Sequence, residues 1–478
     1  MTTPTGPTTR PDLTTLGELR ADGHVRRDVK DEIREHLLAR LAAGEPTLPG
    51  IVGFEHTVIP EVERALLAGH DMVLLGERGQ GKTRLIRTLI SLLDEWTPVV
   101  AGCEINDHPY APSCRRCQTL VADRGDGTPI GWLHRESRYG EKLATPDTSV
   151  GDLIGDIDPI RVAEGRTLGD PETIHYGLLP RTNRGIFSVN ELPDLAERIQ
   201  VALLNVLEER DIQVRGYALR LPLDVLLVAS ANPEDYTNRG RIITPLKDRF
   251  GAEVRTHYPL DLADEIDLIG QEAHVAWPGG STLPAPVVPQ HLIELVARYT
   301  RLVREAPQVD QRSGVSARFA IAAVETVAAS AVRRAAVVGE PPVARICDLP
   351  AVVAASRGKV EFDDADEGRE IEVLDHLLRR ATAETFRARL AGVDLSALQQ
   401  RFDDGAPVET GDDVPAAELL RQVGRFAGLA VLMERLGIDE GAEDPGLAAA
   451  ATEFALEGLH LSRRLAKDEI DGHTVYGS

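Results

Sequence analysis

Residues 72–83 read MVLLGERGQGKT, and this stretch decides the fold. Its apolar start predicts a buried strand, and a Gly-x-x-x-x-Gly-Lys-Thr spacing follows directly, before a helix expected from Thr83 to Leu93. The glycines let backbone N–H groups surround phosphates, and the helix start adds a positive end to that anion site. A chance glycine turn is the alternative, but both flanks fit a phosphate-binding loop. The expected nucleotide contacts are Gly76, Gly79, Gln80, Gly81, Lys82 and Thr83.

Within this loop, two side chains have specific expected roles. Lys82 should reach the β- and γ-phosphates of a nucleoside triphosphate, and the hydroxyl of Thr83 should ligate Mg²⁺.

Short apolar runs alternate with amphipathic helices on both sides of the loop. Further strands are expected at residues 99–101, 185–189 and 224–229. A helix is expected at residues 199–209, after the strand at 185–189. This alternation indicates an α/β core with a mostly parallel sheet flanked by helices. Beyond Pro259 the pattern becomes helical, with the expected helices at residues 289–305, 316–339, 370–401 and 414–436.

Four parts of the chain are expected from these changes of pattern. Residues 1–50 form an N-terminal arm with one helix, the first 20 residues being frayed, and residues 51–260 form the nucleotide-binding domain. A Gly/Pro/Asp-rich insertion interrupts that domain at 107–180. A helical lid at 261–357 and a helical C-terminal extension at 358–478 follow.

Composition narrows the functional classes. The 478 residues carry 76 acidic and 53 basic side chains, a formal charge of −23, which argues against broad nucleic-acid binding. No apolar run approaches the length of about 20 residues that a membrane span needs, and no signal peptide is evident. Four cysteines are too few for a disulfide scaffold, so we expect a cytoplasmic protein.

An acidic strand end is the second element that triphosphate hydrolysis needs. Residues 186–191 read IFSVNE, and Glu191 is placed to orient or deprotonate the attacking water. Asn190 stands where an aspartate usually holds the water shell of the metal, and its amide brings no charge, so Mg²⁺ binding or hydrolysis should be weakened. The alternative is that Glu191 only caps the next helix.

The strings around these two motifs resemble the AAA+ ATPases of the MoxR and magnesium-chelatase I-subunit type. Residues 182–192 (TNRGIFSVNEL) match the Walker B region of that group, and the phosphate loop stands in the same order as in the chelatase subunit. The other matching strings lie at residues 154–158, 177–179, 231–234 and 246–251. The resemblance covers about residues 51–340 and implies an ATPase that assembles into a ring.

The resemblance also implies roles for individual residues. Asn232 matches the sensor asparagine near the γ-phosphate, and Arg249 matches the arginine finger that reaches the nucleotide of a neighbouring subunit. Arg318 matches a lid arginine, with Arg312 as a rival and a solvated helix-start arginine as the alternative for either. Residues 212–228 correspond to a hairpin that projects from such rings, although a plain surface hairpin would give the same pattern.

A cluster of soft ligands lies at the start of the insertion and just before it. Cys103, His108, Cys114 and Cys117 could together hold a structural Zn²⁺, although their first two spacings are not those of a common zinc finger. A redox pair at the Cys-x-x-Cys, or simply reduced thiols, are the alternatives. Cys347 stands alone and is expected to be a core thiol.

The leading hypothesis is a ring-forming ATPase, expected as a hexamer, that remodels or inserts metal into a partner protein, such as one with a von Willebrand A-type domain. Magnesium chelation proper and a slow scaffold that binds ATP are the alternatives, the latter favoured by Asn190. An enhancer-binding transcription activator is disfavoured, because the sequence has no GAFTGA string and no evident DNA-reading helix. The expected cofactors are ATP, Mg²⁺ and, at the cysteines, Zn²⁺.

Overall fold

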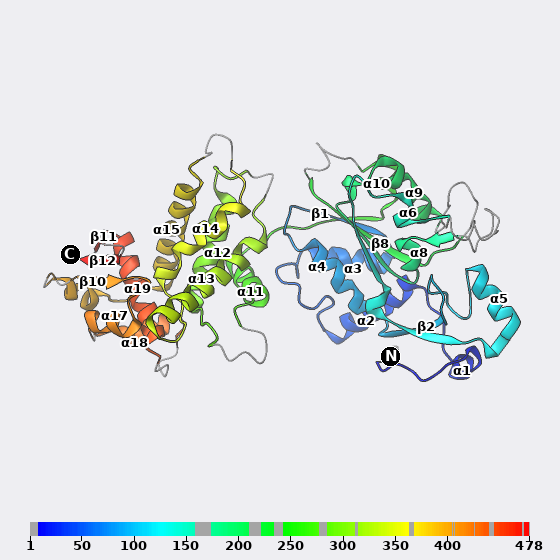
Figure 1. Ribbon diagram of the computed structural model, residues 1–478, viewed down its shortest axis with the longest axis horizontal. Helices are drawn as coiled ribbons and strands as arrows, with labels where there is room; N and C mark the ends of the chain where they lie inside the picture. The colour runs from blue at the N-terminus through cyan, green and yellow to red at the C-terminus, as the bar shows by residue number, and fades with distance from the viewer. Residues whose placement is uncertain are drawn as a thin grey trace. The chain divides into compact units, whose positions relative to one another are not determined.

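The computed structural model divides into two compact units, Met1–His257 and Tyr258–Ser478, each described here by itself (Figure 1). The described residues are 8–157, 174–209, 221–233, 242–276, 284–310, 314–362, 368–403, 405, 407–424, 426–438, 444–470 and 473–477. The division after His257 falls close to the boundary expected at 260.

A five-stranded sheet in the order β4-β7-β8-β1-β9 forms the centre of the first unit. Every neighbouring pair in this sheet is parallel. Its strands are β4 (Tyr139–Leu143), β7 (Gly185–Asn190), β8 (Val225–Ala231), β1 (Met72–Leu75) and β9 (Ala252–Arg255). All residues of β1, β7 and β8 are buried, as expected when helices cover both faces of a parallel sheet. The predicted α/β fold class is confirmed.

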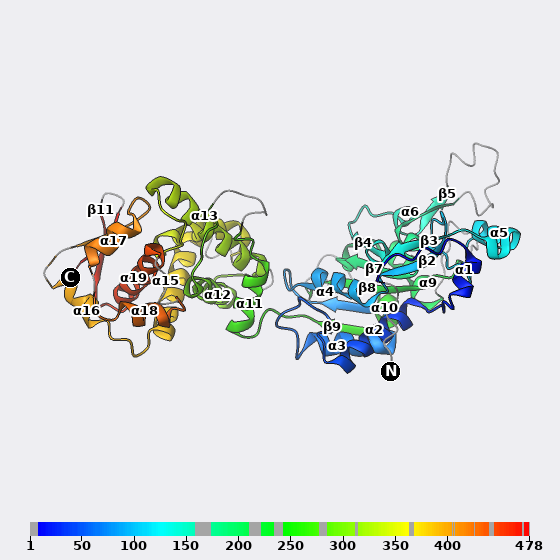
Figure 2. The same ribbon diagram turned by 90° about the horizontal axis from the view of Figure 1, so that it is seen from below.

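Helices cover the two faces of this sheet (Figures 1 and 2). On one face, α2 (Val29–Ala43), α3 (Val58–Ala68), α4 (Lys82–Thr88) and the following 3₁₀ turn η1 (Leu89–Leu92) share a core with β1 and β8. On the other face, α8 (Leu178–Arg181), α9 (Glu197–Glu208) and α10 (Thr244–Arg249) pack on β7 and β8. Both core clusters are predominantly aliphatic.

The second predicted strand lies outside the parallel sheet. Residues 99 and 100 belong to β2 (Trp96–Val100), which pairs antiparallel with β3 (Ile130–His134) as a separate two-stranded ribbon. The parallel sheet instead contains β4, a strand that comes from within the predicted insertion. The insertion is therefore not one added module, because it supplies a strand of the main sheet. Its other described elements are α5 (Arg115–Arg124), η2 (Gly125–Gly127), η3 (Arg135–Arg138), α6 (Val150–Leu153), β5 (Gly155–Ile157) and β6 (Ile174–Tyr176).

The N-terminal arm holds two helices rather than the one predicted. A capping box between Thr15 and Glu18 starts α1 (Leu16–Ala21). Leu16 and Leu19 are fully buried and pack against Ile130, so the described part of the first 20 residues is not frayed.

The second unit is mostly helical, as predicted, but it also contains a small sheet that the sequence pattern did not predict. The predicted lid and extension share one continuous core, which runs from Ile269 to Tyr476. The strands β10 (Val408–Thr410), β12 (His473–Gly477) and β11 (Ala466–Ile470) pair antiparallel in that order. The helices are α11 (Leu262–Glu272), α12 (Gln290–Glu305), α13 (Ala317–Val338), α14 (Pro350–Ser356), α15 (Glu370–Arg389), α16 (Ser396–Gln399), α17 (Ala416–Val423), α18 (Leu429–Arg435) and α19 (Pro445–Leu461).

Among the described helices of either unit, none combines the length and the apolar character required to cross a membrane.

A buried ion pair joins the N-terminal arm to the sheet. Arg138 donates to both carboxylate oxygens of Glu32 at 2.7 Å and to the carbonyl of Arg184 at 2.7 Å. Glu32 also accepts from the backbone N–H of Asp94. The side chains of Glu32 and Arg138 are 5% and 1% exposed, so neither charge can be solvated if its partner is lost.

We predict that Glu32→Gln lowers the free energy of unfolding by about 3 kcal/mol, because it leaves the Arg138 charge buried and uncompensated. Urea denaturation followed by circular dichroism would measure the change. Glu35→Gln is the matched control, because Glu35 is 40% exposed in its pair with Arg27 and should contribute less than about 1 kcal/mol. Equal effects of the two variants would contradict the prediction.

Candidate functional site

The phosphate loop connects β1 to α4 at the carboxyl edge of the sheet. Gly79 and Gly81 adopt left-handed backbone conformations, with φ of 74° and 73°. A Cβ at Gly76 would overlap the side chains of Thr256 and Gln80. α4 begins at Lys82, so the loop leads directly into a helix start, as the sequence predicts.

A chain of hydrogen bonds joins three predicted site residues across neighbouring strand ends. The Nζ atom of Lys82 donates to Oδ1 of Asn232 at 2.9 Å, and Nδ2 of Asn232 donates to Oε2 of Glu191 at 2.6 Å. Lys82 Nζ also donates to the carbonyls of Gly76 and Glu77, the latter at 2.8 Å. The structure thus brings Lys82, Glu191 and Asn232 together, with Lys82 and Asn232 buried.

Glu191 sits at the strand-to-turn transition after β7. Its φ of 55° is a left-handed conformation that non-glycine residues rarely adopt. Its side chain does not cap the following turn η5 (Leu192–Asp194), since no capping hydrogen bond is present there and the carboxylate meets Asn232 instead. Strained backbone of this kind is common at functional positions.

Gln80 faces inward rather than toward solvent. Its Oε1 accepts from the backbone N–H of Glu77 at 3.0 Å and from the Thr256 hydroxyl at 2.8 Å. Gln80 therefore braces the loop against the end of β9. A cavity of about 330 Å³ adjoins the loop, and it is lined by Leu75, Gly76, Glu77, Gln80, Pro233, Lys247, Glu253, Arg255 and Thr256.

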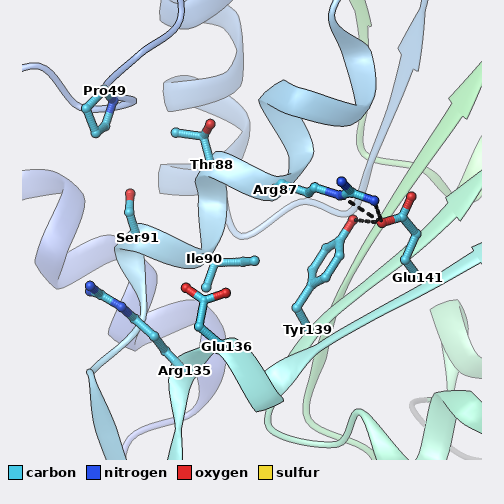
Figure 3. Close-up of a pocket in the computed structure, with 9 residues that line it drawn as sticks. All are labelled: Pro49, Arg87, Thr88, Ile90, Ser91, Arg135, Glu136, Tyr139 and Glu141. Atoms are coloured by element: carbon cyan, nitrogen blue, oxygen red, sulfur yellow. Dashed lines mark hydrogen bonds and ion pairs between the residues drawn. The ribbon is translucent and has the colours of Figure 1, made fainter. Parts of the chain in front are cut away.

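Asn190 contacts a carboxylate that the sequence pattern did not reveal. Its Nδ2 donates to Oε1 of Glu141 at 2.6 Å, and Glu141 comes from the neighbouring strand β4. The other oxygen of Glu141 accepts from Arg87 at 2.7 Å and from the Tyr139 hydroxyl at 3.1 Å (Figure 3). Burial raises the pKa of Tyr139 to about 12, so the hydroxyl keeps the proton that it donates. The alternation of strand β4 places Tyr139 and Glu141 on one face, which is the one sequence signal that could have pointed to this contact.

The two arginines expected from the resemblance lie in different units. Arg249 ends α10, where its Nε donates to Glu208 at 2.7 Å and its Nη1 donates to the carbonyl of Pro245 at 2.9 Å. Arg318 is exposed in the first turn of α13 in the second unit. Arg312, Glu234 and residues 212–220 of the expected hairpin lie outside the described residues.

The three clustered cysteines also come together, but His108 does not join them. The ligand atoms of Cys103, Cys114, Cys117 and Asp107 all lie within 4.8 Å of one another. Nδ1 of His108 accepts from the Tyr110 N–H at 3.0 Å, and its Nε2 lies 3.3 Å from Nε2 of His24. The fourth side chain at the cysteines is thus Asp107, which sequence reasoning missed because only the adjacent histidine was weighed.

Cys347 lies apart from these cysteines, in the second unit, and its thiol is unpaired with another cysteine. Its side chain is only partly buried and is not among the buried core residues of that unit, although burial raises the pKa of the thiol.

Comparison with known proteins gives one family match and several relatives. The model of the Sigma-54 interaction domain matches residues 167–249. The magnesium-chelatase subunit ChlI of Anabaena variabilis is 29% identical over 205 residues, which are 42% of this chain and 57% of that protein. The magnesium-chelatase 38 kDa subunit of Rhodobacter capsulatus is 30% identical over 246 residues, covering 48% of this chain and 62% of that protein. The chain thus spans little more than half the length of the curated relatives it matches.

Solved structures give weaker likenesses. A magnesium-chelatase BchI–BchD complex matches at 22% identity with a TM-score of 0.35, over 68% of this chain and 97% of that chain. The RuvB Holliday junction branch migration motor of Thermotoga maritima matches at 12% identity with a TM-score of 0.34, over 94% and 90% of the two chains. The sequence relatives and the assembled loop motifs agree with each other: this part of the chain is similar to AAA+ ATPases of the magnesium-chelatase I type.

Proposed function

We propose that the chain hydrolyses ATP in a self-assembled ring, expected to be a hexamer, and couples that hydrolysis to the remodelling of a partner protein. The observation that carries the proposal is the connection from Lys82 through Asn232 to Glu191, in which one amide is hydrogen-bonded to both a cation and a carboxylate. The magnesium-chelatase relatives support an ATP-dependent activity more strongly than they support any particular partner protein.

Each side chain has a defined part in this chemistry. The backbone N–H groups of the loop and Lys82 bind the β- and γ-phosphates, and Thr83, one residue farther along α4, would hold Mg²⁺. Glu191 accepts a proton from the attacking water, and Asn232 orients that water toward the γ-phosphate. Mg²⁺ supplies the positive charge that neutralises the phosphate oxygens as the bond to the leaving group breaks.

Arg249 serves the nucleotide of a neighbouring subunit, and Arg318 corresponds to the lid arginine that the resemblance implies. Arg249 is partly exposed, with 31% of its side chain accessible, and it is held by Glu208, which is itself 53% exposed. Because an exposed ion pair of this kind contributes little stability, Arg249 can leave Glu208 and pair with a more highly charged anion such as triphosphate.

From the resemblance to MoxR and chelatase I proteins, we infer that the partner is a cytoplasmic protein with a von Willebrand A-type domain. The alternatives are magnesium chelation proper, supported by the relatives, and a slow scaffold that binds ATP, supported by the missing charge at Asn190.

We predict that Lys82→Ala weakens ATP binding at least about 100-fold, because it removes the charge that meets the β- and γ-phosphates. Titration with a fluorescent ATP analogue would measure the dissociation constant. Lys359→Ala, at an exposed lysine of the second unit, is the matched control. Its dissociation constant for the ATP analogue should equal that of the unaltered protein. Tight binding by the Lys82 variant would reject the phosphate-loop assignment.

We predict that Arg249→Ala keeps ATP binding but lowers turnover about 1,000-fold, the effect typical of losing an arginine finger. Mixing it with Glu191→Gln protein should restore part of the phosphate release, since a subunit with intact Arg249 then faces a site with intact Glu191. The double variant, mixed with either single variant, is the control that should restore nothing. Without any restoration in the first mixture, the idea of a site shared between subunits would fail.

The same phosphate-release assay distinguishes a protein that hydrolyses ATP from a scaffold that binds ATP with little turnover. A hydrolysing engine should release phosphate from ATP, and Glu191→Gln should bind ATP but lose turnover by at least about 100-fold, since general-base groups contribute that much or more. If the unaltered protein and Glu191→Gln release phosphate equally slowly, the scaffold alternative is supported instead.

A further inference from the structure

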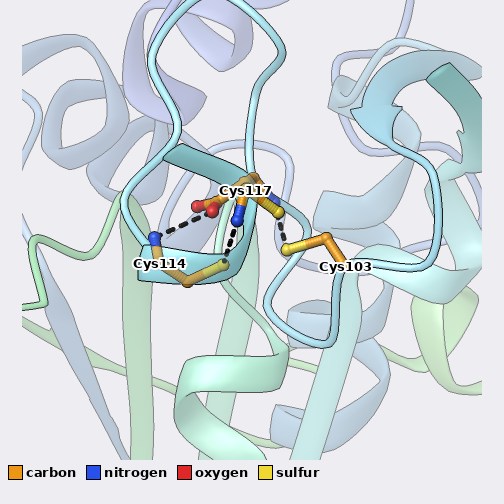
Figure 4. Close-up of side chains that lie close together, drawn as sticks. Cys103, Cys114 and Cys117 are labelled. Atoms are coloured by element: carbon orange, nitrogen blue, oxygen red, sulfur yellow. Dashed lines mark hydrogen bonds between the residues drawn. The ribbon is translucent and has the colours of Figure 1, made fainter. Parts of the chain in front are cut away.

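Four side chains converge where the loop after β2 meets the start of α5 (Figure 4). Cys103 and Asp107 lie on the loop, Cys114 is the N-cap of α5, and Cys117 is on its first turn. Asp107, Cys114 and Cys117 are buried and Cys103 is partly buried. Their ligand atoms all lie within 4.8 Å of one another.

One carboxylate oxygen of Asp107 is buried without a hydrogen-bond partner among the described residues. The Oδ2 atom of Asp107 accepts from the backbone N–H of Cys114 at 2.9 Å, but Oδ1 has no hydrogen-bond partner although Asp107 is only 1% exposed. A buried carboxylate oxygen without a partner is strongly unfavourable unless a cation meets it. The three sulfur atoms beside it are the natural neighbours of such a cation.

We propose that Cys103, Cys114, Cys117 and Asp107 bind a structural Zn²⁺ through their three Sγ atoms and Oδ1. Zinc prefers four ligands in a tetrahedron, and thiolate and carboxylate are both among its usual ligands. At a Zn–S distance of about 2.3 Å the sulfur atoms would lie about 3.8 Å apart, which small side-chain rotations can reach from the observed spacing.

The surrounding hydrogen bonds suit thiolate ligands. The N–H of Asp107 points at Sγ of Cys103 at 3.3 Å, and the N–H of Cys117 points at Sγ of Cys114 at 3.4 Å. The guanidinium of Arg116 lies 3.9 Å from Sγ of Cys117, and the start of α5 adds its positive end. Donors of this kind orient metal ligands and partly neutralise their charge.

His108 is excluded as the fourth ligand by its own contacts. Both ring nitrogens face other partners, Tyr110 and His24. A zinc ion would tie the loop after β2 to α5 and so fix the antiparallel ribbon at the edge of the unit. Because all four ligands come from protein, the site is closed and structural rather than catalytic.

The test is the metal content of the full-length protein purified without chelators from zinc-supplemented cells. We expect about one zinc per chain by atomic emission spectroscopy in the unaltered protein, and at least a tenfold lower content in Cys114→Ser and Asp107→Asn. His108→Ala and Cys347→Ser are the matched controls, and both should keep the zinc.

Cobalt substitution gives a second readout that does not depend on stability. A Co²⁺-loaded protein should show the visible absorption of a tetrahedral ion with a thiolate charge-transfer band, and Asp107→Asn should change the visible bands. Zinc below about 0.1 per chain in the unaltered protein, together with no cobalt spectrum, would overturn the proposal. A disulfide between Cys114 and Cys117 in that protein would overturn it in favour of a redox pair, and loss of zinc in His108→Ala but not in Asp107→Asn would overturn the ligand set.

A second inference stands on a different observation, the contact between Asn190 and Glu141, and it rests on the proposed function. An amide at position 190 brings no charge to the water shell of Mg²⁺, yet its Nδ2 donates to a carboxylate at 2.6 Å. Arg87, which also contacts Glu141, lies one helical turn after Thr83 on α4, so both residues share a face of that helix. Glu141 therefore lies along the helix face that presents the expected metal ligand.

We infer that Glu141 supplies, through Asn190, the negative charge that position 190 lacks. It is a positioning residue: it orients the amide of Asn190, whose Oδ1 receives the hydroxyls of Ser188 and Ser230 at 3.4 and 3.3 Å, and it adds its field to the metal site. Its side chain is 22% exposed and borders a cavity of about 590 Å³, so its charge is only partly screened.

Magnesium dependence of nucleotide binding tests this inference without measuring turnover. Glu141→Gln should raise the Mg²⁺ concentration at the midpoint of tight ATP binding about tenfold, and binding measured in EDTA should not change. Asn190→Asp should restore the midpoint in the Glu141→Gln background, because it returns the charge. In the unaltered background the same change places two carboxylates in contact and should not improve the midpoint.

Glu136→Gln is the matched control, since Glu136 lines the same cavity (Figure 3), whereas the carboxylate that Asn190 contacts is that of Glu141. An unchanged midpoint in Glu141→Gln, or an Asn190→Asp gain that is the same in both backgrounds, would overturn this inference alone. Absence of ATP binding in the unaltered protein would overturn the proposed function as well, and so distinguishes the two failures.

Discussion

The candidate active site depends on one physical constraint: parallel strands bring their carboxyl ends to the same edge of a sheet. β7, β8 and β1 lie side by side, so the residues that follow them meet there although they are far apart in the chain. Lys82 and Asn232 are separated by 150 positions and Asn232 and Glu191 by 41, yet the three form one hydrogen-bonded chain. The buried amide of Asn232 joins them because it donates to one charge and accepts from the other.

This constraint explains which parts of the site could be predicted from the sequence. The phosphate loop and Glu191 depend on residues that are adjacent in the chain, and their spacing already carries the chemistry. The role of Asn232 could be inferred only from the family resemblance, because no feature of the neighbouring sequence distinguishes it from other asparagines at strand ends. Glu141 was missed because its strand, β4, was placed in an insertion, and its partner Asn190 lies 49 positions away.

The errors in the fold have a similar origin. Val99 and Val100 have the apolar character of a sheet strand, but nothing in their composition states which strand they pair with, and they pair with β3. Strand β11 is polar and mostly exposed, and β10 and β12 are only 3 and 5 residues long, so their residues gave no core pattern. At the cysteines, spacing alone predicted that three side chains lie close together, whereas the presence of Asp107 rather than His108 beside them depends on side-chain directions, which the sequence does not encode locally.

The exposed position of Arg249 agrees with a role outside its own chain. Among the described residues of one chain, its guanidinium is hydrogen-bonded to Glu208 and to the carbonyl of Pro245, at the end of α10. If this arginine served to stabilise the fold, its partner would be expected to be buried, as Glu32 is for Arg138. Breaking an exposed pair costs no more than about 1 kcal/mol, whereas a guanidinium placed on the γ-phosphate of a neighbour contributes several kcal/mol to the transition state. The balance of these energies supports the proposal that hydrolysis depends on assembly, with ATP between two subunits drawing Arg249 away from Glu208.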